Sequence, residues 1–210
     1  SGDERIPCES WPVPSFAGIR FERSVGPPAV PYVSTRGCYY GRCHFCAIPA
    51  GWASNGYGGS APAPLVVEQI QRIVEETGIK RIKFVDESMP PQKAREISQL
   101  IPGHDLQVEW EAYARLEPAW QSPSLLEQAH RAGLRKLYFG LEQAPAASRA
   151  LMNKGDHGDP LQILRACQRA GIRAHLFCMV GYPGTSAADA GVTTRFLLDN
   201  QHLSDTADLV

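Results

Sequence analysis

The chain has 210 residues, of which 43% are hydrophobic and 20% charged, and its formal net charge is −1. This composition supplies enough apolar material for a sizeable core in one domain. Lysines and arginines are dispersed, so nothing indicates a basic surface for nucleic acid or for an anionic membrane. No apolar run approaches the roughly 20 residues that a membrane span needs, and the start SGDERIPCES lacks the pattern of a signal peptide. We therefore expect a cytoplasmic protein that acts on a small molecule or a peptide.

The first part of the chain is rich in proline. Residues 1–30 include the stretch PCESWPVPSFAGIRFERSVGPP, which predicts an extended linker. Residues 31–210 are then expected to form the folded domain. Its first element is a short buried strand predicted over 29–37, and the Gly- and Pro-rich residues 51–64 predict a loop.

Between that strand and that loop, the stretch RGCYYGRCHFC contains three of the six cysteines, at C-x4-C-x2-C spacing. A reducing cytoplasm argues against disulfides and favours metal or redox chemistry for Cys38, Cys43 and Cys46. Three thiolates suit zinc or an iron–sulfur cluster. Structural zinc needs a fourth ligand, for which the nearest candidates, His44 and Cys8, are poorly placed. Three cysteines would instead leave one iron of a cubane cluster open to a substrate or cofactor.

The other three cysteines stand alone in the sequence. Cys167 lies in a helical pattern and Cys178 in a strand-like run. Both are expected to be small buried hydrophobic residues. Cys8 has no partner at the spacing of a zinc finger.

Strand and helix patterns alternate through the rest of the chain. Helices are predicted over 65–78, 91–103, 121–133, 145–155, 159–171 and 186–200, and strands over 81–87, 106–117, 135–142, 172–184 and 206–210. We interpret the strands as too apolar for a half-exposed sheet, which favours parallel strands wrapped by helices.

The predicted fold class is therefore α/β. Five or six units are fewer than a closed eight-unit barrel of roughly 250 residues contains. We expect an open, partial (β/α)6-type TIM-like barrel, with a doubly wound sheet as the alternative. Because no helix follows the last strand, we also expect the natural polypeptide to continue beyond Val210.

Polar or glycine-rich groups follow each predicted strand. They are the cysteine loop, Asp86 with Glu87, Arg115, Glu142 with Gln143, and the turn GYPG from Gly181 to Gly184. In barrels of this type the working site lies at the carboxyl ends of the strands. All five groups would then face one mouth of the barrel.

The motifs STRGCYYGRCHFC, KFVDE, YFGLEQA followed by MNKG, and GIRAHLFCMVGYPGT occur in this order from about Pro31 to the end of the chain. In this order they resemble the radical S-adenosylmethionine (SAM) superfamily, and most of all its cobalamin-binding branch. One departure is the C-x4-C-x2-C spacing, because the commonest spacing in the superfamily is C-x3-C-x2-C.

The resemblance implies a [4Fe–4S] cluster held by Cys38, Cys43 and Cys46, with SAM bound to the fourth iron. It implies reductive cleavage of SAM to a 5′-deoxyadenosyl radical that abstracts hydrogen from a substrate, with the difficult chemistry supplied by the cofactor. It also implies an electron donor of the flavodoxin or ferredoxin kind, and a cobalamin carried by an upstream domain outside these residues.

The same resemblance suggests roles for individual residues in binding SAM. The carboxylate of Glu142 would accept hydrogen bonds from the ribose hydroxyls, and Arg115 would pair with the methionine carboxylate. Phe45 would pack near the adenine, and Asp86 and Glu87 would receive the methionine ammonium. The plainer interpretation of these acids is that they are solvated residues at strand ends.

Other residues carry weaker signals. Gly181 and Gly184 belong to a turn by composition alone, and only their place after a strand suggests contact with SAM. His175 is interpreted as a packed histidine, and Lys154 as a substrate contact or a helix cap without an assigned role. No side chain is predicted to be catalytic.

Several reactions remain open at the level of sequence. The main hypothesis includes a cobalamin-type methyltransferase and an enzyme that modifies a natural product or a peptide. One alternative is an RNA-modifying methylthiotransferase, which shares much of this motif order. The other is a non-catalytic zinc or iron–sulfur module.

Overall fold

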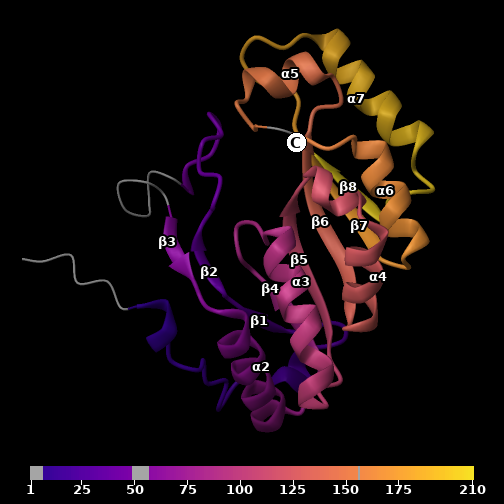
Figure 1. The fold of residues 1–210 in the computed structure, drawn as a ribbon. Coiled ribbons are helices and arrows are strands. Elements are labelled where there is room, and N and C mark those ends of the chain that lie inside the picture. The colour runs from indigo at the N-terminus through magenta and orange to yellow at the C-terminus, as the bar shows by residue number, and fades with distance from the viewer. Residues whose placement is uncertain (1–6, 49–56, 156) are drawn as a thin grey trace, which may run out of the picture.

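The computed structural model describes residues 7–48, 57–155 and 157–210. Six strands form a sheet in the order β1-β4-β5-β6-β7-β8 (Figure 1). All neighbouring strands are parallel. The strands are β1 (Val30–Tyr32), β4 (Arg81–Phe84), β5 (Glu109–Arg115), β6 (Leu134–Glu142), β7 (Arg173–Cys178) and β8 (Thr206–Leu209).

The order of the strands decides between the two predicted architectures. Along the chain, each strand of this sheet pairs with the previous strand of the same sheet, without the reversal of a doubly wound sheet. The edge strands β1 and β8 do not pair with each other. The predicted α/β fold with an open, partial barrel is therefore confirmed.

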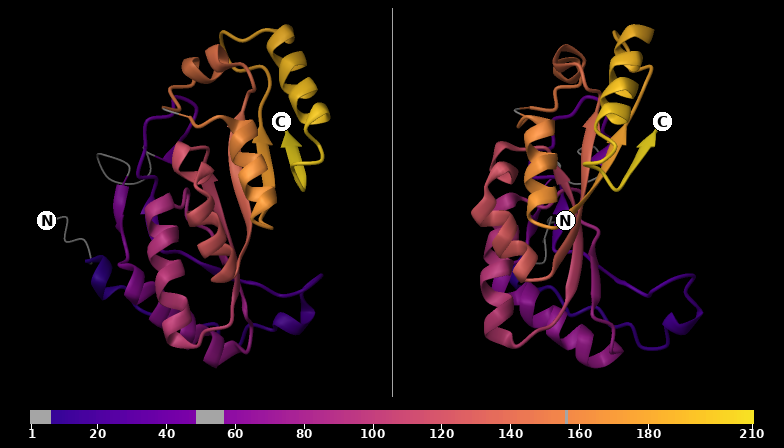
Figure 2. Two further views of the ribbon diagram at one scale, coloured as in Figure 1. Left: turned by 45° about the vertical axis from the view of Figure 1, so that its right-hand side comes forward. Right: turned by 90° about the vertical axis from the view of Figure 1, so that its right-hand side faces the viewer.

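Helices cover one face of this sheet, as both views in Figure 2 show. They are α2 (Ala63–Thr77), α3 (Pro91–Leu100), α4 (Pro123–Arg131) and α6 (Pro160–Arg169). Two further helices, α5 (Ala146–Leu151) and α7 (Ala187–Asp199), lie toward the carboxyl ends of the strands (Figure 1). No helix among the described residues is long and apolar enough to cross a membrane.

Local sequence signals explain where several helices begin and end. The helix α2 ends at Gly78, whose φ of 70° lies in the left-handed region that glycine adopts without strain. Ser122 caps α4 by accepting a hydrogen bond from the amide of Leu125. The predicted helix over 91–103 is shorter than expected, because it ends at Leu100 and continues as a 3-10 helix, Ile101–His104.

The prediction was wrong about the segment around the cysteine loop. The single strand expected over 29–37 is two strands, and the second, β2 (Thr35–Gly37), pairs with β3 (Tyr57–Ser60) in a small antiparallel sheet. Part of the expected loop over 51–64 is thus a strand, while residues 51–56 lie outside the described residues. The glycines make this pairing possible, because a Cβ at Gly58 would lie only 3.1 Å from the Cβ of Arg36.

Residues 7–29 form no strand and contain two 3-10 helices, Cys8–Ser10 and Phe21–Arg23. This segment packs on α2. The Ser15 hydroxyl donates a hydrogen bond to Glu76 Oε1 at 2.7 Å, and Gln69 Nε2 donates one to the carbonyl of Trp11 at 2.8 Å. The division of the chain at residue 30 stays a prediction.

The two faces of the large sheet differ in chemistry. Buried apolar residues of β4 to β7 face the helices, namely Ile82, Phe84, Trp110, Ala112, Leu137, Phe139, Ala174 and Leu176. Polar and aromatic residues occupy the alternate positions, namely Lys83, Glu111, Tyr113, Lys136, Tyr138, His175 and Phe177, and contact one another across the strands. The interpretation that the strands are too apolar for a half-exposed sheet was therefore wrong. Helices cover only the outer face of a partial barrel, so the side chains of the inner face do not have to be apolar.

The outer face contributes much of the stability of the fold. Phe139 is fully buried and meets the Trp120 ring edge-on, with ring centroids 6.3 Å apart. We predict that Phe139→Ala lowers the free energy of unfolding by about 3–5 kcal/mol, because it removes a large buried side chain and leaves a cavity. Chemical denaturation measures this change. Val192→Ala, at a residue that is 52% exposed on α7, is the control and should change stability little.

Candidate functional site

The predicted site residues meet at a pocket of about 170 Å³ at the carboxyl ends of the strands. Cys38, Cys43 and Cys46 line it, so the structure brings the three cysteines of the motif together. Four of the predicted SAM-binding residues also line the pocket: Phe45, Glu87, Arg115 and Glu142. A larger groove of about 450 Å³ runs past Lys80 and Gly133 at the opposite ends of the strands, and none of the predicted site residues lines it.

The spacing of the thiols bears on which metal they suit. Among residues 7–48, 57–155 and 157–210, no three His, Cys, Asp or Glu side chains are close enough together to hold one metal ion. A zinc ion gathers its thiolates at about 2.3 Å around one centre. In a cubane cluster each thiolate binds a different iron, so the thiolates are farther apart. Three cysteines around one pocket match the three protein ligands of a [4Fe–4S] cluster with one open iron.

The surroundings of the Cys43 thiol favour its neutral form. Burial raises the pKa of the Cys43 thiol, and the nearby Cys38 and Cys46 also raise it. Lys154 and Arg115 act in the opposite direction. Because thiolates are the ligands that bind iron, binding of a cluster by these cysteines would release protons.

The cysteine loop is fixed against the segment 151–155, which follows α5. The amide of His44 donates a hydrogen bond to the carbonyl of Met152 at 3.0 Å. Tyr40 Oη donates one to the carbonyl of Asn153 at 2.8 Å, and Asn153 Nδ2 donates one to the carbonyl of Arg42 at 2.9 Å. The MNKG motif is thus the support on which the loop rests, a role that the sequence did not reveal.

Glu142 occupies an unusual backbone position at the end of β6. Its φ is 61°, and the pairing of β6 with β7 shifts register between Gly140 and Glu142. The carboxylate accepts a hydrogen bond from the ammonium of Lys154, which also donates one to the carbonyl of Gly140 at 2.5 Å. A Cβ at Gly140 would collide with both side chains. Gly140, two residues before Glu142, therefore leaves room for the buried ion pair.

Lys154 is a residue of the pocket to which sequence reasoning gave no role. Only 5% of its surface is exposed, and it lines the pocket with Glu142. A lysine is rarely this deeply buried unless its charge is paired, as the charge of Lys154 is with Glu142. The signal in the sequence was the MNKG motif, which follows Glu142 closely enough in the chain for Lys154 to contact that carboxylate.

Arg115 presents a free donor at the pocket. Its Nε lies 3.1 Å from Glu117 Oε1, its Nη2 donates a hydrogen bond to the carbonyl of Lys154 at 2.5 Å, and its Cζ lies 3.6 Å from the centre of the Tyr40 ring. Its Nη1 is buried and has no hydrogen-bond partner among the described residues. A buried unpaired donor is costly, and a carboxylate ligand would satisfy it.

Three of the predicted SAM contacts lie elsewhere. Asp86 does not line the pocket, because its carboxylate accepts hydrogen bonds from the amide and hydroxyl of Ser34 and from the amide of Thr35, at 2.6, 2.5 and 2.9 Å. It supports the turn between β1 and β2, and of the two neighbouring acids only Glu87 lines the pocket. Gly181 and Gly184 are exposed and do not line the pocket either.

With this geometry established, comparison with known proteins defines the class of the chain. Residues 32–197 match the sequence model of the Radical SAM superfamily. The chain therefore belongs to the radical SAM superfamily, whose enzymes use a [4Fe–4S] cluster and SAM.

Particular relatives include methyltransferases and methylthiotransferases. An uncharacterized methyltransferase of Pyrococcus horikoshii is 24% identical over 190 residues, which are 88% of this chain and 40% of that protein. The ribosomal protein uS12 methylthiotransferase RimO of Streptomyces griseus is 30% identical over 172 residues, which are 74% of this chain and 33% of that protein. The chain thus spans less than half the length of the curated relatives it matches.

Solved structures share the fold. The radical SAM methyltransferase TsrM of Kitasatospora setae, with tryptophan and a SAM analogue bound, superposes with a TM-score of 0.70 at 16% identity, over 86% of this chain and 35% of TsrM. The cobalamin-dependent radical SAM enzyme OxsB, with cobalamin and SAM bound, gives a TM-score of 0.65 at 17% identity, over 81% of this chain and 26% of OxsB.

The support of the cysteine loop by segment 151–155 can be tested at a glycine. A Cβ at Gly155 would lie 2.6 to 2.8 Å from atoms of the Tyr40 ring, whereas a Cβ at Gly26 would meet nothing within 4 Å. Both glycines have positive φ, of 80° and 90°. Gly155→Ala and Gly26→Ala should therefore suffer similar backbone strain, and Gly155→Ala should lose about 1–3 kcal/mol more through overpacking.

Thermal and denaturant unfolding of the two variants measures the difference. Gly155→Ala should also bind less iron after anaerobic reconstitution, because displacement of Tyr40 disturbs the cysteine loop. Equal stability and equal iron content in the two variants would contradict the assigned support.

Proposed function

We propose that this chain is the SAM-cleaving core of a radical SAM enzyme, with its substrate in the open mouth of the partial barrel. The observation that supports this most strongly is a single pocket lined by Cys38, Cys43 and Cys46 together with Arg115 and Glu142. When bound, the cluster and SAM supply reductive cleavage of a carbon–sulfur bond and a 5′-deoxyadenosyl radical that abstracts hydrogen from the substrate. The residues of the chain bind and orient these groups.

The charged groups of the pocket match the polar ends of SAM. Arg115 would pair with the methionine carboxylate through the buried nitrogen that has no partner. Glu87 lines the same pocket and is our candidate to bind the methionine ammonium. Asp86 could take this role only by giving up its hydrogen bonds to the backbone. Glu142 would accept hydrogen bonds from the ribose hydroxyls.

Lys154 and Phe45 complete this arrangement. Lys154 would hold the carboxylate of Glu142 in one orientation and leave its second oxygen for the ribose. The Lys154 ammonium lies 5.9 Å from the centre of the Phe45 ring. Phe45, which lines the pocket, would pack against the adenine.

The likeness to cobalamin-dependent enzymes supports a cobalamin carried by a further domain of the protein. We propose a small molecule or a peptide as substrate and a flavodoxin- or ferredoxin-like protein as electron donor, in the cytoplasm. Methyl transfer is the reaction class we favour, since the relative from Pyrococcus horikoshii is described as a methyltransferase.

A second candidate is methylthiotransfer, which the RimO relatives at 28% to 30% identity support. The products distinguish the two reactions, because a methylthio group adds sulfur to the acceptor and a methyl group does not. Mass spectrometry of a modified acceptor decides between them.

Anaerobic reconstitution with iron and sulfide, followed by SAM and a reductant, tests the proposal. We expect 5′-deoxyadenosine from the wild-type chain. Replacing Cys38, Cys43 or Cys46 with Ala should abolish both cluster assembly and this product, since three thiolates hold the irons. A chain that binds a full cluster and SAM under reduction without forming 5′-deoxyadenosine would support the non-catalytic alternative.

The remaining cysteines are the matched controls. Cys167→Ala and Cys178→Ala remove fully buried residues, so they should cost packing stability and leave the iron content unchanged. Cys8→Ala should also retain iron. Loss of iron in Cys8→Ala would indicate a fourth thiolate ligand and would remove the open iron on which SAM binding depends.

The ribose assignment is tested with Glu142→Gln, which keeps the size of the side chain at a position of positive φ. We predict that SAM binding weakens by about 1.5–3 kcal/mol, the range for hydrogen bonds to charged groups. Titration of SAM into the reconstituted protein measures the affinity. Because Glu142→Gln also leaves the buried Lys154 ammonium without a charged partner, which is destabilising, SAM affinity is compared at equal iron content. Glu127→Gln, at an exposed site, should bind SAM like the wild type.

A further inference from the structure

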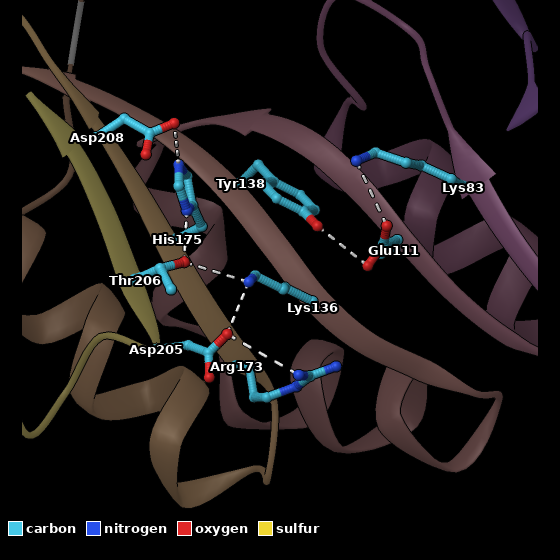
Figure 3. A network of polar contacts seen from close by, with 9 residues as sticks. All are labelled: Lys83, Glu111, Lys136, Tyr138, Arg173, His175, Asp205, Thr206 and Asp208. Carbon is cyan, nitrogen blue, oxygen red and sulfur yellow. Dashed lines mark hydrogen bonds and ion pairs between the residues drawn. The ribbon is translucent and has the colours of Figure 1, made fainter. Parts of the chain in front are cut away.

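The inner face of the sheet continues the candidate site away from the cysteines. Barrel interiors are usually filled by branched apolar side chains. Here the inner positions of β4 to β7 hold charged and aromatic residues, of which Figure 3 labels Lys83, Glu111, Lys136, Tyr138 and His175. A polar surface of this kind inside an open barrel is suited to a ligand rather than to a packed core.

The part of this face nearest the cysteines is aromatic. Tyr113, Tyr138 and Phe177, from three neighbouring strands, all line the pocket. The Phe177 ring lies within 22° of parallel to Tyr113 and within 21° of parallel to Tyr138, with ring centroids 6.0 and 6.3 Å apart. We call these three rings the aromatic floor. Three aromatic side chains that border one open pocket offer aromatic contact to a flat ligand.

Lys83 borders the aromatic floor and carries a loosely paired charge. Its ammonium lies 4.6 Å from the centre of the Tyr138 ring and 5.4 Å from that of Tyr113. Its carboxylate neighbour, Glu111, is 3.6 Å away, which is longer than a hydrogen bond, while Tyr138 Oη donates a hydrogen bond to the other oxygen of Glu111 at 3.2 Å. The side chain of Lys83 remains 31% exposed.

The charges farther along the face are already paired with one another. Lys136 Nζ lies 2.7 Å from Asp205 Oδ2, and His175 Nδ1 lies 2.6 Å from Thr206 Oγ1 (Figure 3). The second ring nitrogen of His175 lies 3.4 Å from Asp208. These contacts join β8 to β6 and β7. Lys83 is therefore the better candidate on this face to pair with a ligand.

We propose that the inner face binds the substrate as a flat aromatic or conjugated ring with an anionic group, the ring lying on the aromatic floor and the anion pairing with Lys83. When the anion of the ligand lies beside the Lys83 ammonium, Glu111 still accepts its hydrogen bond from Tyr138. As a statement about the substrate, this rests on the proposed function. As a statement about binding, it rests on the described residues alone.

Ligand-detected NMR titrations of the reconstituted protein with SAM test the proposal, with three probes. Benzoate has a ring and a carboxylate, cyclohexanecarboxylate lacks the aromatic face, and benzylamine has the opposite charge. We expect benzoate to bind most tightly. Lys83→Met should weaken benzoate binding about tenfold, as expected for the loss of a charged partner, and should leave benzylamine no weaker. Lys80→Met, at an exposed lysine outside the inner face, is the matched control and should bind benzoate like the wild type.

A second variant separates the ring contact from the charge. Phe177→Leu should reduce the preference for benzoate over cyclohexanecarboxylate, and Tyr138→Phe, which keeps the ring, should retain it. Equal binding of the three probes, or benzoate binding unchanged in Lys83→Met, overturns the proposal. Iron content and SAM affinity are measured in the same samples. If the protein binds no iron or no SAM while benzoate still binds through Lys83, the proposed function is wrong, and the proposed binding surface remains supported.

Discussion

The buried ion pair between Lys154 and Glu142 connects the parts of the candidate site. It joins the end of β6 to the segment that follows α5, with both side chains almost fully buried. The carbonyl of Lys154 accepts a hydrogen bond from Arg115, and its neighbour Asn153 is bonded to the cysteine loop. A buried charge that loses its partner is strongly destabilising. The pair therefore holds four separate segments, including the end of β5, around one pocket.

The alternation of side chains along the strands divides the sheet into a stabilising face and a binding face. Residues such as Phe84, Trp110 and Phe139 pack against the helices and hold the strands in register. The positions between them do not pack against helices, because none of the helices in the described part of the chain covers the inner face (Figure 2). The same strands thus stabilise the fold on one side and present Lys83 and the aromatic floor on the other.

Much of the site was predictable from local patterns. Three cysteines in nine positions indicated a metal centre, and the acids and arginine at the strand ends indicated one mouth of a parallel sheet. The sequence did not show which of the two neighbouring acids, Asp86 or Glu87, lines the pocket. Asp86 and Glu87 follow the same strand, and only the hydrogen bonds of Asp86 to Ser34 and Thr35 show that its carboxylate supports a turn.

The sequence by itself determined the α/β class, the order of the helices and strands from α2 onward and the cysteine motif, since periodicity, glycine and proline positions and cysteine spacing are local properties. Tertiary structure alone decided the pairing of β2 with β3, the ion pair of Lys154 with Glu142 and the polar character of the inner face. Each of these depends on which segments meet after the chain has folded. A lysine in a loop and a lysine in a strand look alike in the sequence, and only the groups packed around them separate a buried partner such as Lys154 from an available charge such as Lys83.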